Sequence, residues 1–265
     1  MDVLGGAAVP EPGARRAGPV QTTDSAPPCG LRLPCGGLGP SVDGVVPTVD
    51  FSGLQITYDE RVLEPRGWTA DQSRWAAELI AQAPPGRVLE LCCGAGQIGL
   101  LATALTAENR RRPLVAVDLN PAAVNLTAAN AATAGLDGWV EVREGDMTEV
   151  VGEDERFAVI IADPPWVPTD RTARYPQDPM LAIDGGADGL TVARRCARVM
   201  QRHLHPDGLA VLQLGARDQV DALDLTAYGL QVTAVRQGER GVLVRVSRGQ
   251  PGRPSPPGTG VTARS

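Results

Sequence analysis

Residues 87–99, RVLELCCGAGQIG, join a short apolar run to a turn rich in glycine. The apolar run predicts a buried strand, and a helix is expected to begin at about Gln97. Between them, Gly94, Gly96 and Gly99 allow the backbone to turn tightly and to approach a ligand. Because the N-terminus of a helix favours an anion, this segment predicts a binding site for a cofactor that carries a negative charge.

The glycine turn alone does not identify the cofactor. The bound anion would be the methionine carboxylate in S-adenosylmethionine and the pyrophosphate in NAD. A second strand is expected at residues 114–117 and leads into Asp118, whose carboxylate can accept both ribose hydroxyls of either cofactor. Both cofactors therefore remain open at this point.

Two further carboxylates favour S-adenosylmethionine. Glu90 stands one position before the end of the first strand, where it can accept the methionine ammonium, whereas a dinucleotide site has no need of a buried carboxylate there. Asp146 follows a third expected strand at 139–142 and is well placed to hold the adenine amino group. Since ligands of open parallel sheets bind at the carboxyl ends of the strands, these side chains are expected to converge.

The fourth expected strand, residues 157–162, is followed by Asp163-Pro164-Pro165-Trp166. The Asp163 carboxylate and the Pro164 carbonyl can each accept a hydrogen from a planar NH2 group, while the indole of Trp166 stacks on its plane. Loss of conjugation at that nitrogen exposes its lone pair for attack on an electrophile, and the natural electrophile is a sulfonium methyl. We therefore predict Asp163, Pro164, Pro165 and Trp166 as the catalytic residues.

The chain resembles the HemK-type protein-glutamine N5-methyltransferases, which are class I S-adenosylmethionine-dependent methyltransferases. The resemblance runs from about Tyr58 to Leu214 and is carried by ITYDERVLEPRGWT, VLELCCGAGQIGL, VAVDLNPAAVNLTAANA, EVREGD, IIADPPWVPTD and AIDGGADGL. It implies that the cofactor is lined by Glu90, Gly94, Gly96, Asp118 and Asp146. The predicted cofactor site also includes Cys92, Leu119, Met147 and Asp163.

Two departures from that family bear on the substrate. The family's usual motif is Asn-Pro-Pro-Tyr, whereas Asp-Pro-Pro-Trp is more like enzymes that act on the exocyclic amino group of adenine. The family also carries an N-terminal helical domain that grips its protein substrate, which has no counterpart in this sequence. We predict transfer of a methyl group to a planar amide or amino nitrogen. The alternatives are a methyltransferase for nucleobase amines in rRNA or DNA, an NAD(P)-dependent oxidoreductase and a non-catalytic adaptor that binds S-adenosylmethionine.

Strands and helices alternate from residue 87 onwards, which predicts an α/β fold with a doubly wound, mostly parallel sheet covered by helices on both faces. A fifth strand is expected at 209–214. Two more strands, at 230–235 and 241–246, are separated by a polar turn and are typical of a hairpin. The resemblance implies a seven-stranded sheet whose last strand is antiparallel.

Three features lie outside this alternation. A hairpin is expected at 48–58 with Gly53 in its turn, and Thr69 with Gln72 predicts a capping box at the start of a helix. The long segment 167–190, between the fourth and fifth strands, is predicted to be a substrate lid because a loop of this length in a compact domain is usually functional.

The composition predicts one domain with two tails. The chain has 265 residues, of which 43% are apolar, which is enough for one substantial core. We assign the domain to residues 47–246. The flanking residues 1–46 and 247–265 are rich in small residues and proline and are predicted to be disordered. The sequence has no signal-peptide pattern and no apolar run of bilayer length, so the predicted location is the cytoplasm, without a membrane partner.

The charge balance argues against a general nucleic-acid binder. The net charge is −6 and all 25 basic residues are arginines, whereas a domain that grips nucleic-acid phosphates is usually basic. A small molecule or an exposed protein amide is therefore favoured as the methyl acceptor. Two groups of arginines are expected to be solvated, one on a helix and one in a loop: Arg194, Arg195, Arg198 and Arg202, and Arg110 to Arg112.

The cysteines and histidines indicate no metal site. The five cysteines, at positions 29, 35, 92, 93 and 196, form no Cys-x-x-Cys pair and are expected to be reduced thiols. His203 and His205 are expected near the end of a helix, as a C-terminal charge and a cap.

Overall fold

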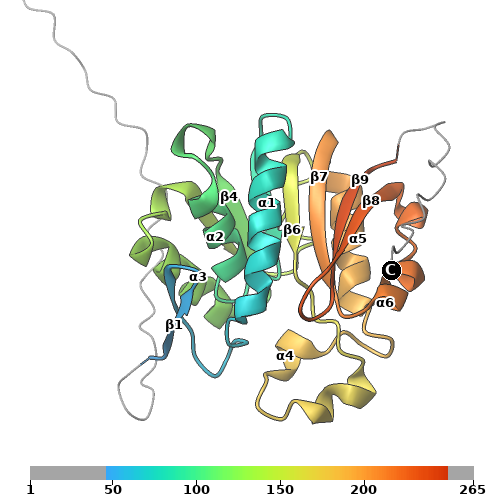
Figure 1. The fold of residues 1–265 in the computed structure, drawn as a ribbon, viewed down its shortest axis with the longest axis horizontal. Coiled ribbons are helices and arrows are strands. Elements are labelled where there is room, and N and C mark those ends of the chain that lie inside the picture. The colour runs from blue at the N-terminus through green and yellow to red at the C-terminus, as the bar shows by residue number, and fades with distance from the viewer. Residues whose placement is uncertain (1–45, 250–265) are drawn as a thin grey trace, which may run out of the picture. The chain divides into compact units, whose positions relative to one another are not determined.

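The computed structural model describes residues 46–249, which Figure 1 shows as a coloured ribbon. The predictions for residues 1–45 and 250–265 lie outside this range. The strands are β1 (Thr48–Phe51), β2 (Leu54–Thr57), β3 (Arg87–Leu91), β4 (Leu114–Asp118), β5 (Val140–Glu144), β6 (Phe157–Ala162), β7 (Leu204–Leu214), β8 (Leu230–Gln237) and β9 (Val242–Arg248). The α-helices are α1 (Ala70–Gln82), α2 (Gln97–Leu105), α3 (Pro121–Thr133), α4 (Met180–Ile183), α5 (Thr191–His203) and α6 (Arg217–Leu223). Short 3-10 turns lie at Gly67–Thr69, Glu108–Arg110, Asp137–Trp139, Thr169–Arg174 and Leu225–Tyr228.

Seven strands form one sheet in the order β5-β4-β3-β6-β7-β9-β8, which confirms the predicted α/β class. Strands β3 to β7 pair in parallel with their neighbours, whereas β9 is antiparallel to both β7 and β8. The chain enters the sheet at β3, adds β4 and β5 on one side, and then returns to place β6 on the other side of β3. The direction of winding therefore reverses between β3 and β6.

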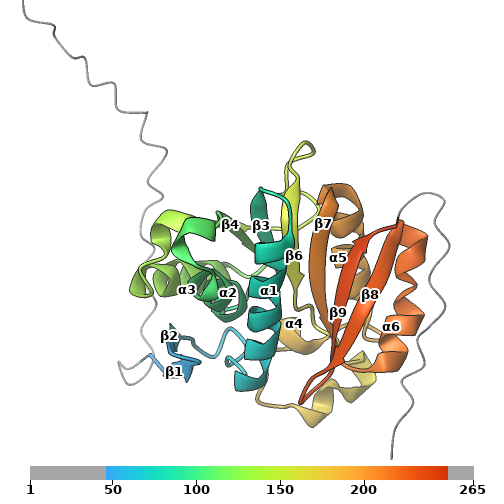
Figure 2. The ribbon, with the colours of Figure 1, turned by 45° about the horizontal axis from the view of Figure 1, so that its top comes forward.

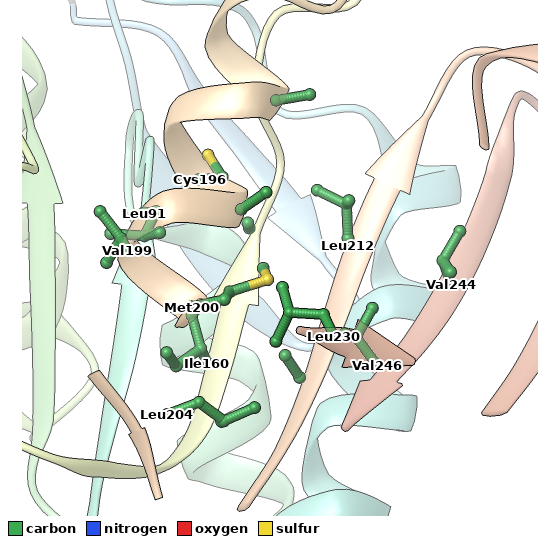
Figure 3. Close-up of a cluster of buried hydrophobic side chains, with 14 of the residues drawn as sticks. Leu91, Ile160, Cys196, Val199, Met200, Leu204, Leu212, Leu230, Val244 and Val246 are labelled. Atoms are coloured by element: carbon green, nitrogen blue, oxygen red, sulfur yellow. The ribbon is translucent and has the colours of Figure 1, made fainter. Parts of the chain in front are cut away.

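Helices cover both faces of the sheet, with α1, α2 and α3 on one face and α5 and α6 on the other (Figure 2). On the second face, Cys196, Val199 and Met200 of α5 pack with Leu91 of β3 and Ile160 of β6 in one buried cluster (Figure 3). Burial on both faces explains why the central strands are almost continuously apolar. None of the described helices combines the length and apolar character needed to cross a membrane.

The expected hairpin is confirmed as β1 and β2, with Ser52 and Gly53 in the turn at positive φ. Asn130 of α3 ties this hairpin to the glycine turn. Its side chain exchanges hydrogen bonds with the backbone of Thr57 at 2.8 and 2.9 Å and also donates to the carbonyl of Ala95 at 2.9 Å. The hairpin therefore supports the segment that was predicted to hold the cofactor.

The predicted capping box at the start of α1 is wrong. Thr69 Oγ1 donates to the carbonyl of Arg66 at 2.8 Å and makes no cap to the helix. Gln72 is fully buried, and its Nε2 donates to the carbonyl of Ala162 at 2.9 Å. Gln72 thus fixes the last residue of β6, immediately before Asp163.

The arginine loop between α2 and β4 differs from the expectation that its arginines are solvated. Arg112 donates to the carbonyls of Ala83 and Pro84, the former at 3.0 Å, and Arg111 donates to the carbonyl of Thr103 at 3.3 Å. These guanidinium groups donate to carbonyls at or just beyond the C-terminal ends of α1 and α2, where helix carbonyls need partners from outside the helix.

The chain beyond α5 also departs from prediction. His203 is buried against the carbonyl of Glu155, with Nδ1 at 3.0 Å, and burial lowers its pKa, so it is a neutral core residue and not a helix-terminal charge. His205 lies within β7 and caps no helix. Ser247 and Arg248, which we had assigned to the C-terminal tail, belong to β9.

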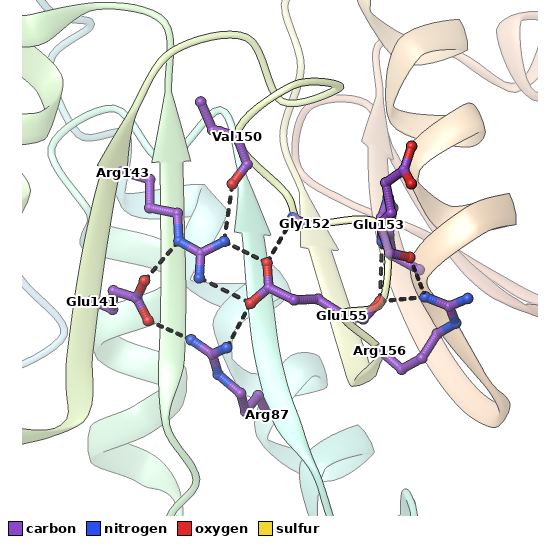
Figure 4. A network of polar contacts seen from close by, with 9 residues as sticks. Arg87, Glu141, Arg143, Val150, Gly152, Glu153, Glu155 and Arg156 are labelled. Atoms are coloured by element: carbon purple, nitrogen blue, oxygen red, sulfur yellow. Dashed lines mark hydrogen bonds and ion pairs between the residues drawn. The ribbon is translucent and has the colours of Figure 1, made fainter.

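A network of ion pairs joins β5 to the starts of β3 and β6 (Figure 4). Arg143 donates to the two carboxylate oxygens of Glu155 at 2.6 and 2.9 Å, and Arg87 donates to the same carboxylate at 2.7 Å. Arg143 also donates to Glu141 at 2.7 Å. The hydrogen bonds from Arg143 lower the pKa of Glu155 to about 2.

We expect Glu155→Gln to lower the free energy of unfolding by about 1–2 kcal/mol at pH 7. The folded-state pKa of Glu155 lies below its unfolded value of 4.5, so this stabilisation is present above that pH and is lost as the pH falls towards 2. Chemical denaturation of the wild type and the variant at pH 7 and pH 3 measures the difference. Glu149→Gln, at an exposed position, is the control. A variant as stable as the wild type at pH 7 contradicts the stabilising role of the network.

Candidate functional site

Strand register brings the carboxyl ends of four strands together. Leu91, the last residue of β3, pairs with Val117 of β4 and with Ala162 of β6. The residues that follow them are therefore neighbours at one edge of the sheet: Cys92, Asp118 and Asp163. Since β4 pairs in turn with β5, the segment that holds Asp146 begins at the same edge.

A cavity of about 150 Å³ opens at this edge and contains most of the predicted cofactor residues. Those in its wall are Cys92, Gly94, Asp118, Leu119, Asp146, Met147 and Asp163. Residues that the sequence did not mark also line it, among them Val62, Leu63, Gln97, Leu181, Val192 and Arg195. We refer to this space as the cofactor cavity. Leu119 and Leu181 are 54% and 57% exposed, so both offer apolar surface to a ligand.

Asp118 fixes the turn at the floor of the cofactor cavity. One carboxylate oxygen accepts from the backbone N–H of Gly94 at 2.9 Å, and the other accepts from that of Asn120 at 2.9 Å. Burial raises the pKa of this carboxyl above its ordinary value. Each oxygen retains a lone pair, so the side chain can still accept hydrogen bonds from two hydroxyl groups of a ligand.

Glu90 lies beneath the glycine turn, and its side chain does not contribute to the wall of either cavity described here. Its Oε1 accepts from the backbone N–H of Gly99 at 2.8 Å, and its Oε2 is buried without a hydrogen-bond partner among residues 46–249. A Cβ on Gly99 would lie 2.2 Å from Oε2, so glycine is required there to make room for the carboxylate. Burial raises the pKa of Glu90 to about 8.

Gly96 also lies outside the wall of the cofactor cavity. Its φ of 82° is in the left-handed region, and a Cβ would lie 2.8 Å from Thr127. Thr127 Oγ1 donates to the carbonyl of Gly94 at 2.9 Å. Gly96 therefore allows close packing of the turn against α3.

Asp146 is paired with a residue that the sequence did not mark for this site. Its Oδ1 accepts from the backbone N–H and the hydroxyl of Thr148, at 3.0 and 2.8 Å, and its Oδ2 forms an ion pair with Arg195 of α5. The hydrogen bonds from Thr148 contribute most to lowering the pKa of Asp146. The prediction that Arg195 belongs to a solvated helix face is wrong, because its side chain lines the cofactor cavity.

A second cavity of about 550 Å³ adjoins the first and contains the whole Asp163-Pro164-Pro165-Trp166 segment. We refer to it as the acceptor cavity. Trp68 and Tyr175 add aromatic surface to its wall. The wall also carries both signs of charge, from Arg66, Arg174 and Arg240 and from Glu64, Asp178 and Glu239. A Cβ on Gly215 would lie 2.3 Å from the Trp166 ring, so the indole is backed by the Gly215 backbone.

Asp163 stands where the two cavities meet. The residues common to both walls are Leu63, Gln97, Asp163, Pro165 and Ala182. Burial raises the pKa of Asp163 to about 7, and its carboxylate makes no hydrogen bond to another residue in the described part of the chain. The carboxylate is therefore available to a ligand that reaches the junction.

The segment between β6 and α5 forms an ordered wall of the acceptor cavity. It contains the 3-10 turn at Thr169–Arg174 and α4, and Val167 is held by backbone hydrogen bonds to Ile183 and Gly185 at 3.0 and 2.8 Å. Asp178 in this segment forms an ion pair with Arg66 at 2.8 Å. Movement of the segment as a lid remains a prediction.

Comparison with known proteins identifies relatives of the chain. Residues 71–212 match the family described as methyltransferase small domain. The chain is 35% identical over 190 residues to the ribosomal protein uL3 glutamine methyltransferase of Bradyrhizobium diazoefficiens, covering 67% of this chain and 58% of that protein. It is 36% identical over 174 residues to the release factor glutamine methyltransferase of Deinococcus radiodurans, covering 64% and 60%. The chain thus spans about three fifths of the length of these relatives.

Solved structures share the fold at low sequence identity. The ribosomal protein L11 methylase from Lactobacillus delbrueckii subsp. bulgaricus superposes with a TM-score of 0.53 and 16% identity, over 73% of this chain and 84% of that chain. The hMettl16 catalytic domain gives a TM-score of 0.57 and 18% identity, over 79% of each chain. These likenesses support the fold assignment alone.

We expect Asp163→Asn to make the ligand-free protein more stable than the wild type at pH 8, by about 2–5 °C in Tm. The folded-state pKa of Asp163 is raised from 3.8 to about 7, so the wild type loses stability as the pH rises from about 4 to 7, where the unfolded carboxyl ionises before the folded one, whereas asparagine does not ionise. The difference should vanish near pH 4. Thermal unfolding at both pH values measures it, with Asp170→Asn as the exposed control. An equal difference at both pH values contradicts the raised pKa.

Proposed function

The chain belongs to the methyltransferase small domain family, and on that basis we propose that it transfers a methyl group from S-adenosylmethionine to the nitrogen of a primary carboxamide. The observation that carries this proposal is the position of Asp163 at the junction of the cofactor cavity and the acceptor cavity. A group transferred between two ligands must pass through such a junction.

The residues of the cofactor cavity suit S-adenosylmethionine chemically. Asp118 retains lone pairs for the two ribose hydroxyls, and Asp146 can accept from the adenine amino group. Leu119 and Met147 offer apolar surface for the adenine ring. The start of α2, which follows the glycine turn, favours the methionine carboxylate.

The acceptor cavity suits a planar NH2 group. The carboxylate of Asp163 and the carbonyl of Pro164 can accept its two hydrogens, and neither group has a hydrogen-bond partner within residues 46–249. Trp166, backed by Gly215, supplies a flat surface on which the amide plane can stack. These contacts hold the nitrogen facing the cofactor cavity, and orientation of this kind supplies a large part of catalysis.

The transfer forms an N–C bond from the nitrogen lone pair and breaks the S–C bond, whose electron pair stays on sulfur as a neutral thioether. The nitrogen must also lose one proton. Because burial raises the pKa of Asp163 to about 7, its carboxylate is a better base near neutral pH than an ordinary aspartate and can take up that proton.

A glutamine side chain is the carboxamide that the relatives indicate, since those named above are glutamine methyltransferases for ribosomal protein uL3 and for a release factor. A nucleobase amine is the second candidate. The aromatic wall formed by Trp68, Trp166 and Tyr175, together with Arg174 and Arg240, favours it, because aromatic rings stack on bases and arginines bind phosphates.

The experiment uses the purified chain with tritium-labelled S-adenosylmethionine and three acceptors: uL3, a release factor and an adenine-rich RNA. We expect label on a glutamine nitrogen of one of the proteins, located by mass spectrometry. Asp163→Ala should lower turnover at least about 100-fold and leave the Kd for S-adenosylmethionine within about twofold.

Asp154→Ala, at an exposed position before β6 and outside both cavities, is the matched control and should keep full activity. Turnover by Asp163→Ala close to that of the wild type contradicts the proposed role of Asp163. Transfer to the RNA alone replaces the carboxamide with a nucleobase amine as the acceptor.

A further inference from the structure

Gln97 is, besides Asp163, the only residue with a polar side chain among the five that line both cavities. It is the first residue of α2 and follows Gly96 directly. The other shared residues, Leu63, Pro165 and Ala182, have apolar side chains. A ligand group at the junction can therefore exchange side-chain hydrogen bonds with these two residues alone among those shared.

The two ends of the Gln97 carboxamide lie in different surroundings. Oε1 is buried without a hydrogen-bond partner among the described residues. It lies on the side of Gly94, because a Cβ built on Gly94 would be 4.0 Å from it. Nε2 is not among the buried unpartnered atoms and makes no hydrogen bond within residues 46–249, so it is the end left open to the cavities. Burial of the oxygen is the less costly orientation, because proteins tolerate an unpaired carbonyl better than an unpaired N–H.

A carboxamide substrate needs a hydrogen-bond donor as well as hydrogen-bond acceptors at the junction. Asp163 and Pro164 accept the hydrogens of the substrate NH2 group. The substrate carbonyl oxygen is bonded to the same carbon as that nitrogen, so it must also lie close to the junction. The ionised Asp163 carboxylate has no hydrogen to give to that oxygen. Gln97 Nε2 has two.

Building on the proposed function, we propose that Gln97 Nε2 donates a hydrogen bond to the carbonyl oxygen of the acceptor amide and so selects a carboxamide over an amine. An amine lacks this oxygen and leaves Nε2 without a partner, and a site built to hydrogen-bond a group discriminates against ligands that lack it. Gln97 is thus an acceptor-binding residue that fixes the direction of the amide plane.

Two bisubstrate analogues test this role without knowledge of the natural acceptor. In both, a nitrogen replaces the sulfur of S-adenosylhomocysteine and carries an ethylene link to a second nitrogen. That second nitrogen bears an acetyl group in one analogue and an ethyl group in the other, so only the first analogue has a carbonyl oxygen. Calorimetry gives the Kd of each analogue for the full-length wild type and for Gln97→Leu.

We expect Gln97→Leu to raise the Kd of the acetyl analogue about tenfold and to change the Kd of the ethyl analogue by less than about twofold. Gln97→His, which retains an N–H donor, should recover part of the loss. Gln82→Leu is the matched control, because Gln82 is exposed at the end of α1 and lines neither cavity. It should change neither Kd.

Equal changes for the two analogues, or no change for either, overturn the role of Gln97. These outcomes leave the proposed methyl transfer standing, because that activity is measured separately with the labelled cofactor and depends on Asp163. Conversely, a protein that binds the acetyl analogue through Gln97 but transfers no methyl group contradicts the proposed function alone.

Discussion

The register of β6 beside β3 is the constraint on which the site depends. Pairing of Leu91 with Ala162 places the glycine turn and Asp163 next to each other, where the direction of winding reverses. A slip by one residue would turn every side chain of β6 to the opposite face, where it would meet neighbours of a different shape, and close packing on both faces opposes such a slip. Gln72 holds the end of β6 through the carbonyl of Ala162. The sheet therefore determines where the cofactor cavity and the acceptor cavity lie relative to each other.

Electrostatics then favours one kind of ligand at this junction. Glu90, Asp118 and Asp163 are close enough that the two aspartates contribute to the raised pKa of Glu90, although burial is the main cause. Burial likewise raises the pKa of Asp118 and of Asp163. A sulfonium cation lowers the cost of ionising these groups, whereas the pyrophosphate of a dinucleotide would add to their repulsion. The buried carboxylates of Asp118 and Asp163, which line the cofactor cavity, are therefore the basis on which we expect S-adenosylmethionine to bind in preference to NAD.

Features that depend on local sequence patterns could be predicted from the sequence. The apolar runs predicted the central strands, and the carboxylates after them predicted the edge at which the cofactor cavity lies. Features set by packing were missed. Glu90 was expected to face the cofactor but lies under α2, because the lack of a side chain at Gly99 leaves room there. Arg195 was read as solvated because helical spacing does not show its partner, Asp146. One feature of the sequence could have indicated Gln97: it is the polar first residue of a helix whose first turn is otherwise apolar.

Isothermal titration of the purified protein with S-adenosylmethionine, S-adenosylhomocysteine and NADH, repeated on Asp118→Ala, tests the methyltransferase assignment most directly. We expect micromolar binding of both adenosyl compounds, no binding of NADH, and a loss of at least about tenfold in affinity in the variant, because Asp118 both fixes the glycine turn and meets the ribose. Binding of NADH with no binding of S-adenosylmethionine would contradict the assignment.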